Sequence, residues 1–373
     1  MSTPLRFHWS LSQAGDDFRR SGATSRMIGL PSRDVQLELC RCAERNGIES
    51  MLMAIGFTRP DPMLLALSLG METTTISFMV ACRAGLISPT MFVQQINTLS
   101  AVLEGRVCIN IVGGHTPTEQ RYYGDFLEHD DRYARTDEFL SVCDAFWRGD
   151  GDVDFNGRYY TIEKGRVSTP FVSRERRSPE IFVGGNSGQA LELARRHASC
   201  LWRFAEAPDA LREKIAPLLP DGVETGLLMG LIVRPEHDEA VAAANALIER
   251  FGAEARDVQR NFVGRSDSVA YNSTFDLANG SADGWITPTL WSGAVPYLGA
   301  PSMALVGSPE EVADAIIEYR RAGITQFLFI GWPDHEEMER FGRDVLPLVR
   351  GKERMLGESS PAAAAREEVG PCR

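Results

Sequence analysis

The sequence lacks the features of a secreted or membrane-spanning protein. No run of about 18 apolar residues occurs in its 373 residues, although a transmembrane helix needs about 20. The opening stretch MSTPLRFHWSLSQAGDD has no basic start followed by an apolar segment, which a secretory signal requires. We therefore expect neither secretion nor membrane insertion.

Cysteine is sparse and is not arranged for disulfides or a metal cluster. The chain has seven cysteines, an odd number, and no C-x-x-C pair. Cys40 and Cys42 fall in a predicted helix, where their side chains point about 200° apart, so they cannot form a bridge or share a metal ion. We predict reduced core cysteines, a cytoplasmic protein and no metal site.

Positive charge is in the minority. The chain has 39 Lys and Arg against 51 Asp and Glu, for a net charge of -12. This excess of negative charge argues against nucleic acid or an anionic membrane surface as a partner. A local basic pocket for a phosphate is still compatible with it. With 43% hydrophobic and 24% charged residues, the composition is typical of a globular protein with a large core.

The chain does show a regular alternation of strand-like and helix-like segments. Eight short apolar runs are predicted strands: 5–11, 50–55, 76–81, 107–112, 181–183, 199–204, 225–233 and 326–330. Helical periods lie between most of them: 32–47, 89–105, 133–149, 187–198, 208–219, 238–252 and 308–323. This order predicts an α/β fold, a (β/α)8 TIM barrel with insertions, whose ligands bind at the carboxyl ends of the strands. A doubly wound open sheet is the alternative.

Two stretches exceed what a barrel needs. Residues 149–178 contain DVDFNGRYYTIEKGRV and are predicted as a β-rich insertion, and residues 257–301 as a second insertion that forms a mobile lid. We predict one barrel domain over residues 1–352. The small and polar residues 353–373 are predicted to be a disordered tail.

The stretch PEIFVGGNSGQALELARR, residues 179–196, combines a strand, a glycine pair and the start of a helix. Gly184 and Gly185 let the backbone turn sharply and approach a ligand. Asn186 or Ser187 can cap the helix, whose free N–H groups attract an anion. An ordinary strand-to-helix turn explains this stretch equally well when it is taken alone.

A second glycine pair follows the fourth predicted strand, in CINIVGGHTPTEQRYYGD. Asn110 is a polar residue within the strand, and Gly113 and Gly114 allow close approach of a flat ligand. His115 could donate a hydrogen bond to a bound group or protonate it. The alternative is an ordinary loop histidine.

Arginines mark two further strand ends. In EHDDRYARTDEFL, Tyr133 could meet a phosphate and Arg132 a carboxylate, although Arg132 could equally belong to a helix-end network with Asp131 or Glu138. In ACRAGLISPT, Arg83 follows the third predicted strand, ahead of a serine and proline that begin a helix.

In their order and spacing, these stretches resemble the bacterial luciferase-like superfamily of flavin-dependent monooxygenases, and most closely the FMNH2-dependent alkanesulfonate monooxygenases. The resemblance spans residues 5–348 and also rests on VDFNGRYY, LWSGAV and ALVGSPEEVADAIIEYRRAGITQFLFIGWPDHEE. It implies a barrel that takes reduced FMN from a separate NAD(P)H-dependent flavin reductase. It also implies that FMNH2 then reacts with O2 through C4a-peroxyflavin chemistry.

The resemblance also implies the residues that hold the cofactor. In such proteins the flavin phosphate lies against the glycine-serine turn and the tyrosine of the RY motif, here Gly185, Asn186, Ser187 and Tyr133. The complete predicted FMN site is Asn110, Gly113, Gly114, His115, Tyr133, Gly184, Gly185, Asn186 and Ser187. Relatives that assemble as dimers or tetramers imply a homodimer or homotetramer here.

The chain departs from the alkanesulfonate branch at the substrate positions. Arg59 stands where that branch has a cysteine, Leu228 and Gly230 where it has an arginine and a histidine, Leu298 where it has a lid arginine, and Trp332 where it has a tyrosine. A sulfonate needs cationic partners. We therefore predict an uncharged or bulky organic substrate. Arg59 either meets a carboxylate or faces solvent.

The candidate catalytic residues are His115, Trp332 and Arg59. Related branches carry a histidine after the fourth strand, and the pKa of an imidazole lies near working pH, which suits an acid-base role for His115. His335 is a reserve candidate. Two other functions stay open: a deazaflavin-dependent dehydrogenase or reductase on the same barrel, and a non-catalytic flavin-binding protein.

Overall fold

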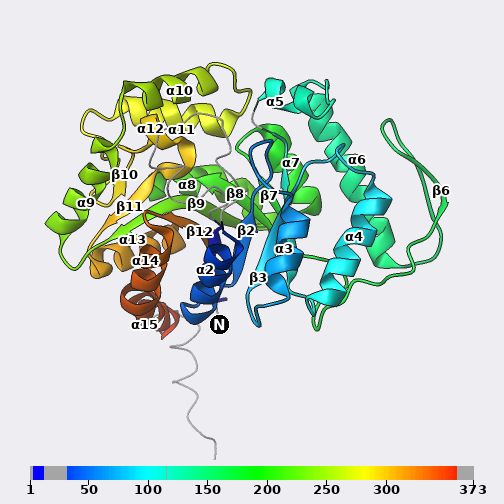
Figure 1. Cartoon of the computed structure of the whole chain (residues 1–373), viewed down its shortest axis with the longest axis horizontal. Coiled ribbons are helices and arrows are strands. Elements are labelled where there is room, and N and C mark those ends of the chain that lie inside the picture. The colour runs from blue at the N-terminus through cyan, green and yellow to red at the C-terminus, as the bar shows by residue number, and fades with distance from the viewer. Residues whose placement is uncertain (1–2, 12–31, 115, 359–373) are drawn as a thin grey trace, which may run out of the picture.

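The computed structural model describes residues 3–11, 32–114 and 116–358, and a closed parallel barrel forms its centre (Figure 1). Its eight strands are β1 (Arg6–Ser10), β2 (Ser50–Met53), β3 (Ser77–Cys82), β4 (Val107–Val112), β7 (Ile181–Gly184), β8 (Cys200–Phe204), β9 (Glu224–Val233) and β12 (Gln326–Gly331). They pair in this order, and β12 pairs with β1 to close the ring. The predicted (β/α)8 barrel is confirmed, and each of its strands overlaps a predicted one.

Side chains along each barrel strand point alternately outward and inward, so one core lies between the strands and the helices and another lies inside the barrel. On β1, Phe7 and Trp9 point outward to the helices, and Phe7 stacks on Phe327 of β12 with ring centroids 5.8 Å apart. His8 points into the barrel, where it contacts Ser50 and Gln326 at 2.7 and 2.9 Å. Burial lowers the pKa of His8 to about 3, so this histidine is a neutral part of the barrel interior. The amino-terminal end of the barrel is therefore filled with packed side chains.

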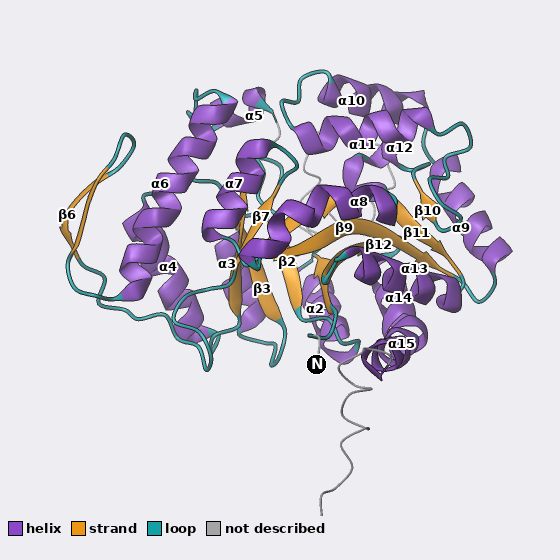
Figure 2. Ribbon diagram, turned by 180° about the vertical axis from the view of Figure 1, so that it is seen from behind, coloured by secondary structure: helices purple, strands orange, loops and turns teal. Residues whose placement is uncertain are grey.

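Helices surround the barrel in both views (Figures 1 and 2). They are α2 (Arg33–Arg45), α3 (Pro62–Gly70), α4 (Pro89–Val102), α5 (Pro117–Tyr122), α6 (His129–Arg148), α7 (Gly188–His197), α8 (Pro208–Ile215), α9 (His237–Glu249), α13 (Pro309–Ala322), α14 (Asp334–Arg340) and α15 (Leu346–Glu358). Local chemistry sets their starts: Ser88 caps α4, and Ser308 and Glu311 form a capping box on α13. Shorter turns are the 3-10 helices η1 (Ala216–Asp221) and η2 (Ala300–Ser302) and the π-helix η3 (Phe341–Val345).

Extra elements lie where the sequence predicts insertions. The antiparallel strands β5 (Val153–Asn156) and β6 (Thr161–Gly165) form a hairpin that projects beside α6 (Figure 2). The second group is α10 (Ala253–Val263), α11 (Val269–Gly280), β10 (Leu290–Trp291) and α12 (Val295–Leu298). It is followed by β11 (Ala304–Gly307), which pairs with the end of β9. Strand β11 was not predicted, because its apolar run is only a few residues long.

The C-terminal helix corrects the predicted start of the tail. Helix α15 continues to Glu358, so residues 353–358 are helical. Glu353 explains this, because its carboxylate accepts hydrogen bonds from the Leu5 N–H and from Arg350, each at 2.7 Å. Residues 359–373 lie outside the described part of the chain.

Two predictions from composition can be checked over the described residues. Cys40, Cys42, Cys82, Cys108, Cys143 and Cys200 are buried and free, which confirms them as core thiols; Cys372 lies outside the described residues. No helix within the described ranges combines the length and the apolar character needed to cross a membrane.

Candidate functional site

A cavity of about 550 Å³ lies at the carboxyl ends of the barrel strands, within the size range of small-molecule sites. The predicted site residues that the structure describes all line it: Arg59, Asn110, Gly113, Gly114, Tyr133, Gly184, Gly185, Asn186, Ser187 and Trp332. His115 lies outside the described residues. The structure thus gathers residues from five separate stretches of sequence around one space.

The turn after β7 forms one end of the cavity. Ser187 is the N-cap of α7, and its hydroxyl oxygen accepts a hydrogen bond from the Ala190 N–H at 3.1 Å. Gly185 has a φ of 149°, and a Cβ atom there would lie 2.7 Å from the Cβ of Ala190, so only glycine fits. The Asn186 Oδ1 atom is buried without a hydrogen-bond partner among the described residues. The free N–H groups of the α7 N-terminus and the Ser187 O–H can therefore receive an anion here.

Tyr133 of α6 joins the two glycine turns. Its hydroxyl lies 3.2 Å from the position that a Cβ atom would take at Gly113, and at the same distance from that position at Gly185. The hydroxyl also hydrogen-bonds with the Ser187 side chain, and burial raises the pKa of the phenol. Tyr133 is therefore a neutral hydrogen-bond donor next to the anion-binding turn, and side chains at either glycine would crowd it.

Arg132 meets a carboxylate, which is one of its two predicted roles. Its Nε donates to the Gly113 carbonyl at 3.1 Å, and its Nη2 donates to Asp267 at 2.5 Å. The hypothesis of a network with Asp131 or Glu138 is wrong, because those carboxylates bind residues of the β5–β6 hairpin region instead. Buried Arg132 ties the turn after β4 to the segment that precedes α11.

An ion pair forms the polar wall of the cavity near β3 and β4. The Arg83 Nη2 lies 2.9 Å from Glu119 Oε1, and the two side chains are only 4% and 11% exposed. The Nε and Nη1 of Arg83 and the Oδ1 of Asn110 are buried without a hydrogen-bond partner among the described residues. Such orphaned groups are costly unless a ligand satisfies them. This wall therefore offers hydrogen-bonding groups of both kinds to a polar ligand edge.

Arg83 was predicted at a strand end without a role, and Glu119 was not predicted as a site residue. A usable signal was present, because Thr116 caps α5 by accepting a hydrogen bond from the Glu119 N–H at 3.3 Å. That capping spacing places Glu119 in the first turn of a helix that follows β4. Its pairing with Arg83 depends on the packing of two loops and could not be found from spacing.

The opposite wall is apolar. Leu228, Leu298, Ile330 and Trp332 line it. Aromatic residues that the sequence analysis missed also line the cavity: Trp202, Phe204, Phe251, Phe262 and Tyr297. Inward alternation with Cys200 along β8 is the signal that could have identified Trp202. Leu228, Leu298 and Trp332 are residues that replace polar side chains of the alkanesulfonate branch, and all three thus lie on the cavity surface.

Two glycines of β9 make room for indole rings. A Cβ atom at Gly230 would lie 2.6 Å from ring atoms of Trp332, and one at Gly226 would overlap the ring of Trp202. Both indole N–H groups are buried without a hydrogen-bond partner among the described residues. The absence of side chains at these glycines therefore lets the two indoles pack directly against the β9 backbone and shape the cavity.

Two other candidates have different surroundings. Arg59 is half buried on the cavity wall, so it does not simply extend into solvent. His335 is 40% exposed at the start of α14 and is not among the residues that line the cavity. Its position does not support a role in this site.

The donor set fits a flat ring system that carries a phosphate. Ser187, Tyr133 and the α7 N-terminus form an anion cradle, and Gly113 and Gly114 keep the neighbouring backbone clear of side chains. Asn110 and Arg83 offer hydrogen bonds farther along the same wall. These are the contacts that a flavin mononucleotide needs.

Similarities to known proteins agree with this geometry. Residues 5–326 match the luciferase-like monooxygenase family. The solved structure of riboflavin lyase RcaE with modified FMN and riboflavin is 20% identical, with a TM-score of 0.75, and the match covers 96% of this chain and 97% of that one. The structure of the long-chain alkane monooxygenase LadA is 19% identical, with a TM-score of 0.74, and the match covers 95% of this chain and 92% of that one.

An F420-dependent secondary alcohol dehydrogenase, in complex with an F420-acetone adduct, is also similar. Its identity is 18% and its TM-score 0.65, over 93% of this chain and all of that one. At these low identities the solved structures establish the fold alone. The family match covers most of the chain, and this protein therefore belongs to the luciferase-like monooxygenase family, as a flavin-dependent monooxygenase.

Proposed function

We propose that this protein is the oxygenating component of a two-component monooxygenase. It takes reduced FMN from an NAD(P)H-dependent flavin reductase and uses O2 to oxygenate an uncharged or bulky organic substrate. The observation that carries this proposal is the convergence of Tyr133, Gly113, Gly185 and Ser187 at one end of a cavity whose other wall is apolar.

Ser187 and Tyr133 would hold the FMN phosphate. Both hydroxyls lie beside the N-terminus of α7, where backbone N–H groups and the helix dipole favour negative charge. The Ser187 oxygen accepts a hydrogen bond from Ala190, and its own proton, which now bonds to Tyr133, would turn to the phosphate. The raised pKa of Tyr133 keeps the phenol protonated as a second donor.

Asn110 and Arg83 would meet the polar edge of the isoalloxazine ring. Their unpaired atoms lie on the same wall as the phosphate cradle, and the ion pair with Glu119 holds Arg83 in place. When bound, reduced FMN supplies two electrons and activates O2. The protein orients the substrate and keeps water out. His115 stays our predicted proton donor to the oxygenating centre.

The apolar wall supports the proposed substrate class. Leu228 and Leu298 line the cavity where the resemblance expects arginines. Trp332 covers Gly230, where it expects a histidine. A sulfonate there would lose its cationic partners, whereas a neutral apolar molecule would gain contact with the leucines and the indole.

One experiment separates this function from its alternatives. The purified protein is mixed anaerobically with FMNH2 or with reduced F420, then exposed to oxygen and a panel of neutral organic compounds. Incorporation of labelled oxygen with FMNH2 supports the monooxygenase. The alternative is supported by the similarity to an F420-dependent enzyme. Hydride transfer from reduced F420 to a substrate without oxygen would replace our proposal with a deazaflavin-dependent reductase. FMN binding without turnover of any compound would leave a flavin-binding protein.

We also propose a homodimer or homotetramer. Leu64 of α3 and Met71 directly after it are 70% and 68% exposed, and Met91 and Val102 of α4 are 48% and 47% exposed. Exposed apolar side chains on neighbouring helices are typical of a subunit interface. Light scattering should give a multiple of 41.2 kDa; the monomer mass at micromolar concentration would contradict the proposal. The cytoplasmic location stays a prediction.

A further inference from the structure

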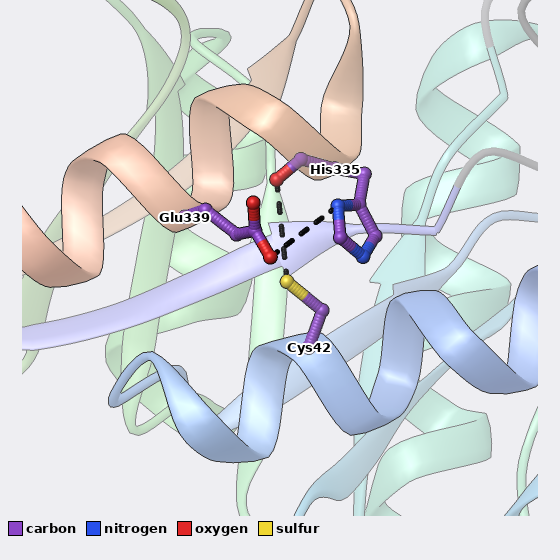
Figure 3. Close-up of side chains that lie close together, drawn as sticks. All are labelled: Cys42, His335 and Glu339. Atoms are coloured by element: carbon purple, nitrogen blue, oxygen red, sulfur yellow. Dashed lines mark hydrogen bonds and ion pairs between the residues drawn. The ribbon is translucent and has the colours of Figure 1, made fainter.

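Three metal-binding side chains gather on the outside of the barrel, away from the cavity. Cys42 lies on α2, and His335 and Glu339 lie on α14 (Figure 3). One ligand atom from each lies within 4.8 Å of the other two. The Nδ1 of His335 is 3.7 Å from Glu339 Oε1. None of the three lines the cavity.

The three donors form a set that zinc prefers. Zinc binds thiolate, imidazole and carboxylate at about 2.0–2.3 Å in a tetrahedral arrangement. His335 and Glu339 are four residues apart on one helix, so their side chains share a face. At these bond lengths the donor atoms of a tetrahedral site lie about 3.3–3.8 Å from each other. The 3.7 Å between His335 and Glu339 already fits, and separations of up to 4.8 Å need to shrink by about 1 Å. His335 and Glu339 are 40% and 48% exposed, which leaves them free to turn toward the buried sulfur.

The surroundings of Cys42 also suit a cation. The Asn46 side-chain N–H lies 3.3 Å from the sulfur, where it would stabilise a thiolate. Zinc binds cysteine as the thiolate, so a bound ion would displace the Cys42 thiol proton.

We propose that Cys42, His335 and Glu339 bind a thiophilic divalent cation, with zinc as the expected ion. The ion would join α2, which follows the first strand of the barrel, to α14, which follows the last. These helices pack against each other where the barrel closes. The expected role is structural, because a metal that binds the folded state stabilises it.

Cobalt is the probe for the first test, since a thiolate bound to Co²⁺ absorbs strongly in the near ultraviolet. The metal-stripped full-length protein is titrated with Co²⁺, followed by Zn²⁺. We expect one equivalent of cobalt, a sulfur charge-transfer band and displacement by zinc. Cys42→Ser should lose the band. His335→Ala and Glu339→Gln should each weaken cobalt binding by at least about 10-fold. Loss of a residue that only supports a metal ligand already costs about that much, and these residues are proposed as ligands themselves.

The chain offers a matched control. His237 and Glu311 form a histidine-carboxylate pair at 3.1 Å with similar exposure, 43% and 40%. Among the described residues, no cysteine joins this pair in a group of three donors. His237→Ala should keep the band and the affinity. A band that persists in Cys42→Ser, equal losses in His237→Ala and His335→Ala, or no cobalt binding to the wild type would overturn the proposal.

Thermal melting gives a readout that does not depend on the spectrum. Zinc should raise the Tm of the wild type and of His237→Ala, and leave that of His335→Ala unchanged. Because His335 and Glu339 are exposed, their variants are expected to fold. An equal zinc effect on all three proteins would also overturn the proposal.

Discussion

The two walls of the cavity are built differently. The wall at β3, β4 and β7 consists of glycine turns, hydroxyls and the buried ion pair of Arg83 with Glu119. Hydrogen bonds such as that from Arg132 to Gly113 hold it in place. The wall at β9, β12 and the α10–α12 region consists mainly of apolar side chains packed by volume.

This difference separates two kinds of recognition. Hydrogen bonds to fixed backbone turns suit a ligand that never changes, such as a cofactor. Apolar side chains can be exchanged for others of similar volume at small cost in stability. Substitutions on such a wall can therefore adapt the cavity to a different substrate. We therefore expect substitutions on the polar wall to impair cofactor binding or folding, and those on the apolar wall to change substrate choice.

The largest expected effect comes from breaking the polar wall's ion pair. Glu119→Ala would leave the buried Arg83 guanidinium without its carboxylate, and we expect a loss of about 3 kcal/mol in the free energy of unfolding. Chemical denaturation measures it. Glu119→Gln is the control, because its amide oxygen can still accept from Arg83 and should recover part of the loss. Equal stability of the wild type and Glu119→Ala would show that the pair does not support the wall.

The next effect concerns catalysis. If His115 donates a proton in the oxygenating step, His115→Ala should lower product formation by about 100-fold, the scale of one general acid. FMN affinity should stay within about tenfold, because the phosphate cradle is unchanged. Product and hydrogen peroxide are measured with a flavin reductase supplying FMNH2, and peroxide should rise. Equal product yields would remove His115 from the mechanism.

Removing the two hydroxyls tests the phosphate cradle. Ser187→Ala combined with Tyr133→Phe should weaken FMN binding by about 1–3 kcal/mol, because the charged phosphate loses a hydrogen bond with each hydroxyl that is removed. Calorimetry with FMN and with riboflavin, which lacks the phosphate, gives the comparison. Riboflavin affinity should change little. Unchanged FMN affinity in the double variant would rule out this placement of the phosphate.

The smallest expected effect lies on the apolar wall. Gly230→Ala places a methyl group against the Trp332 indole, and we expect a loss of about 1 kcal/mol in stability as the ring moves. FMN affinity should be unchanged, while the relative turnover of small and bulky neutral substrates shifts. Gly280→Ala is the control, because a Cβ atom there meets no atom within 4 Å. A change in FMN affinity with no change in substrate preference would break the comparison of the two walls.

The sequence by itself determined the barrel and many of the residues on the polar wall of its cavity. Apolar runs of strand length, helical periods and capping residues are local signals, and a strand end such as Asn110 or a turn such as Gly184-Gly185 can be found from its immediate neighbours. The order of these elements then leaves few ways to arrange a parallel sheet. For this reason the predicted strands agree with those of the structure, and the described cofactor-site candidates lie on one cavity.

Only the tertiary structure decided which side chains meet. Tyr133 contacts Ser187, Arg83 pairs with Glu119, and Trp332 packs over Gly230. The spacing of residues along the chain does not predict these contacts, because each contact joins residues that are far apart in sequence and meet only in the folded protein. The aromatic residues around α10 and α12 were missed for the same reason. Packing volume, unlike turn chemistry, depends on every neighbour at once, so these aromatic members of the apolar wall became visible only when the chain was folded.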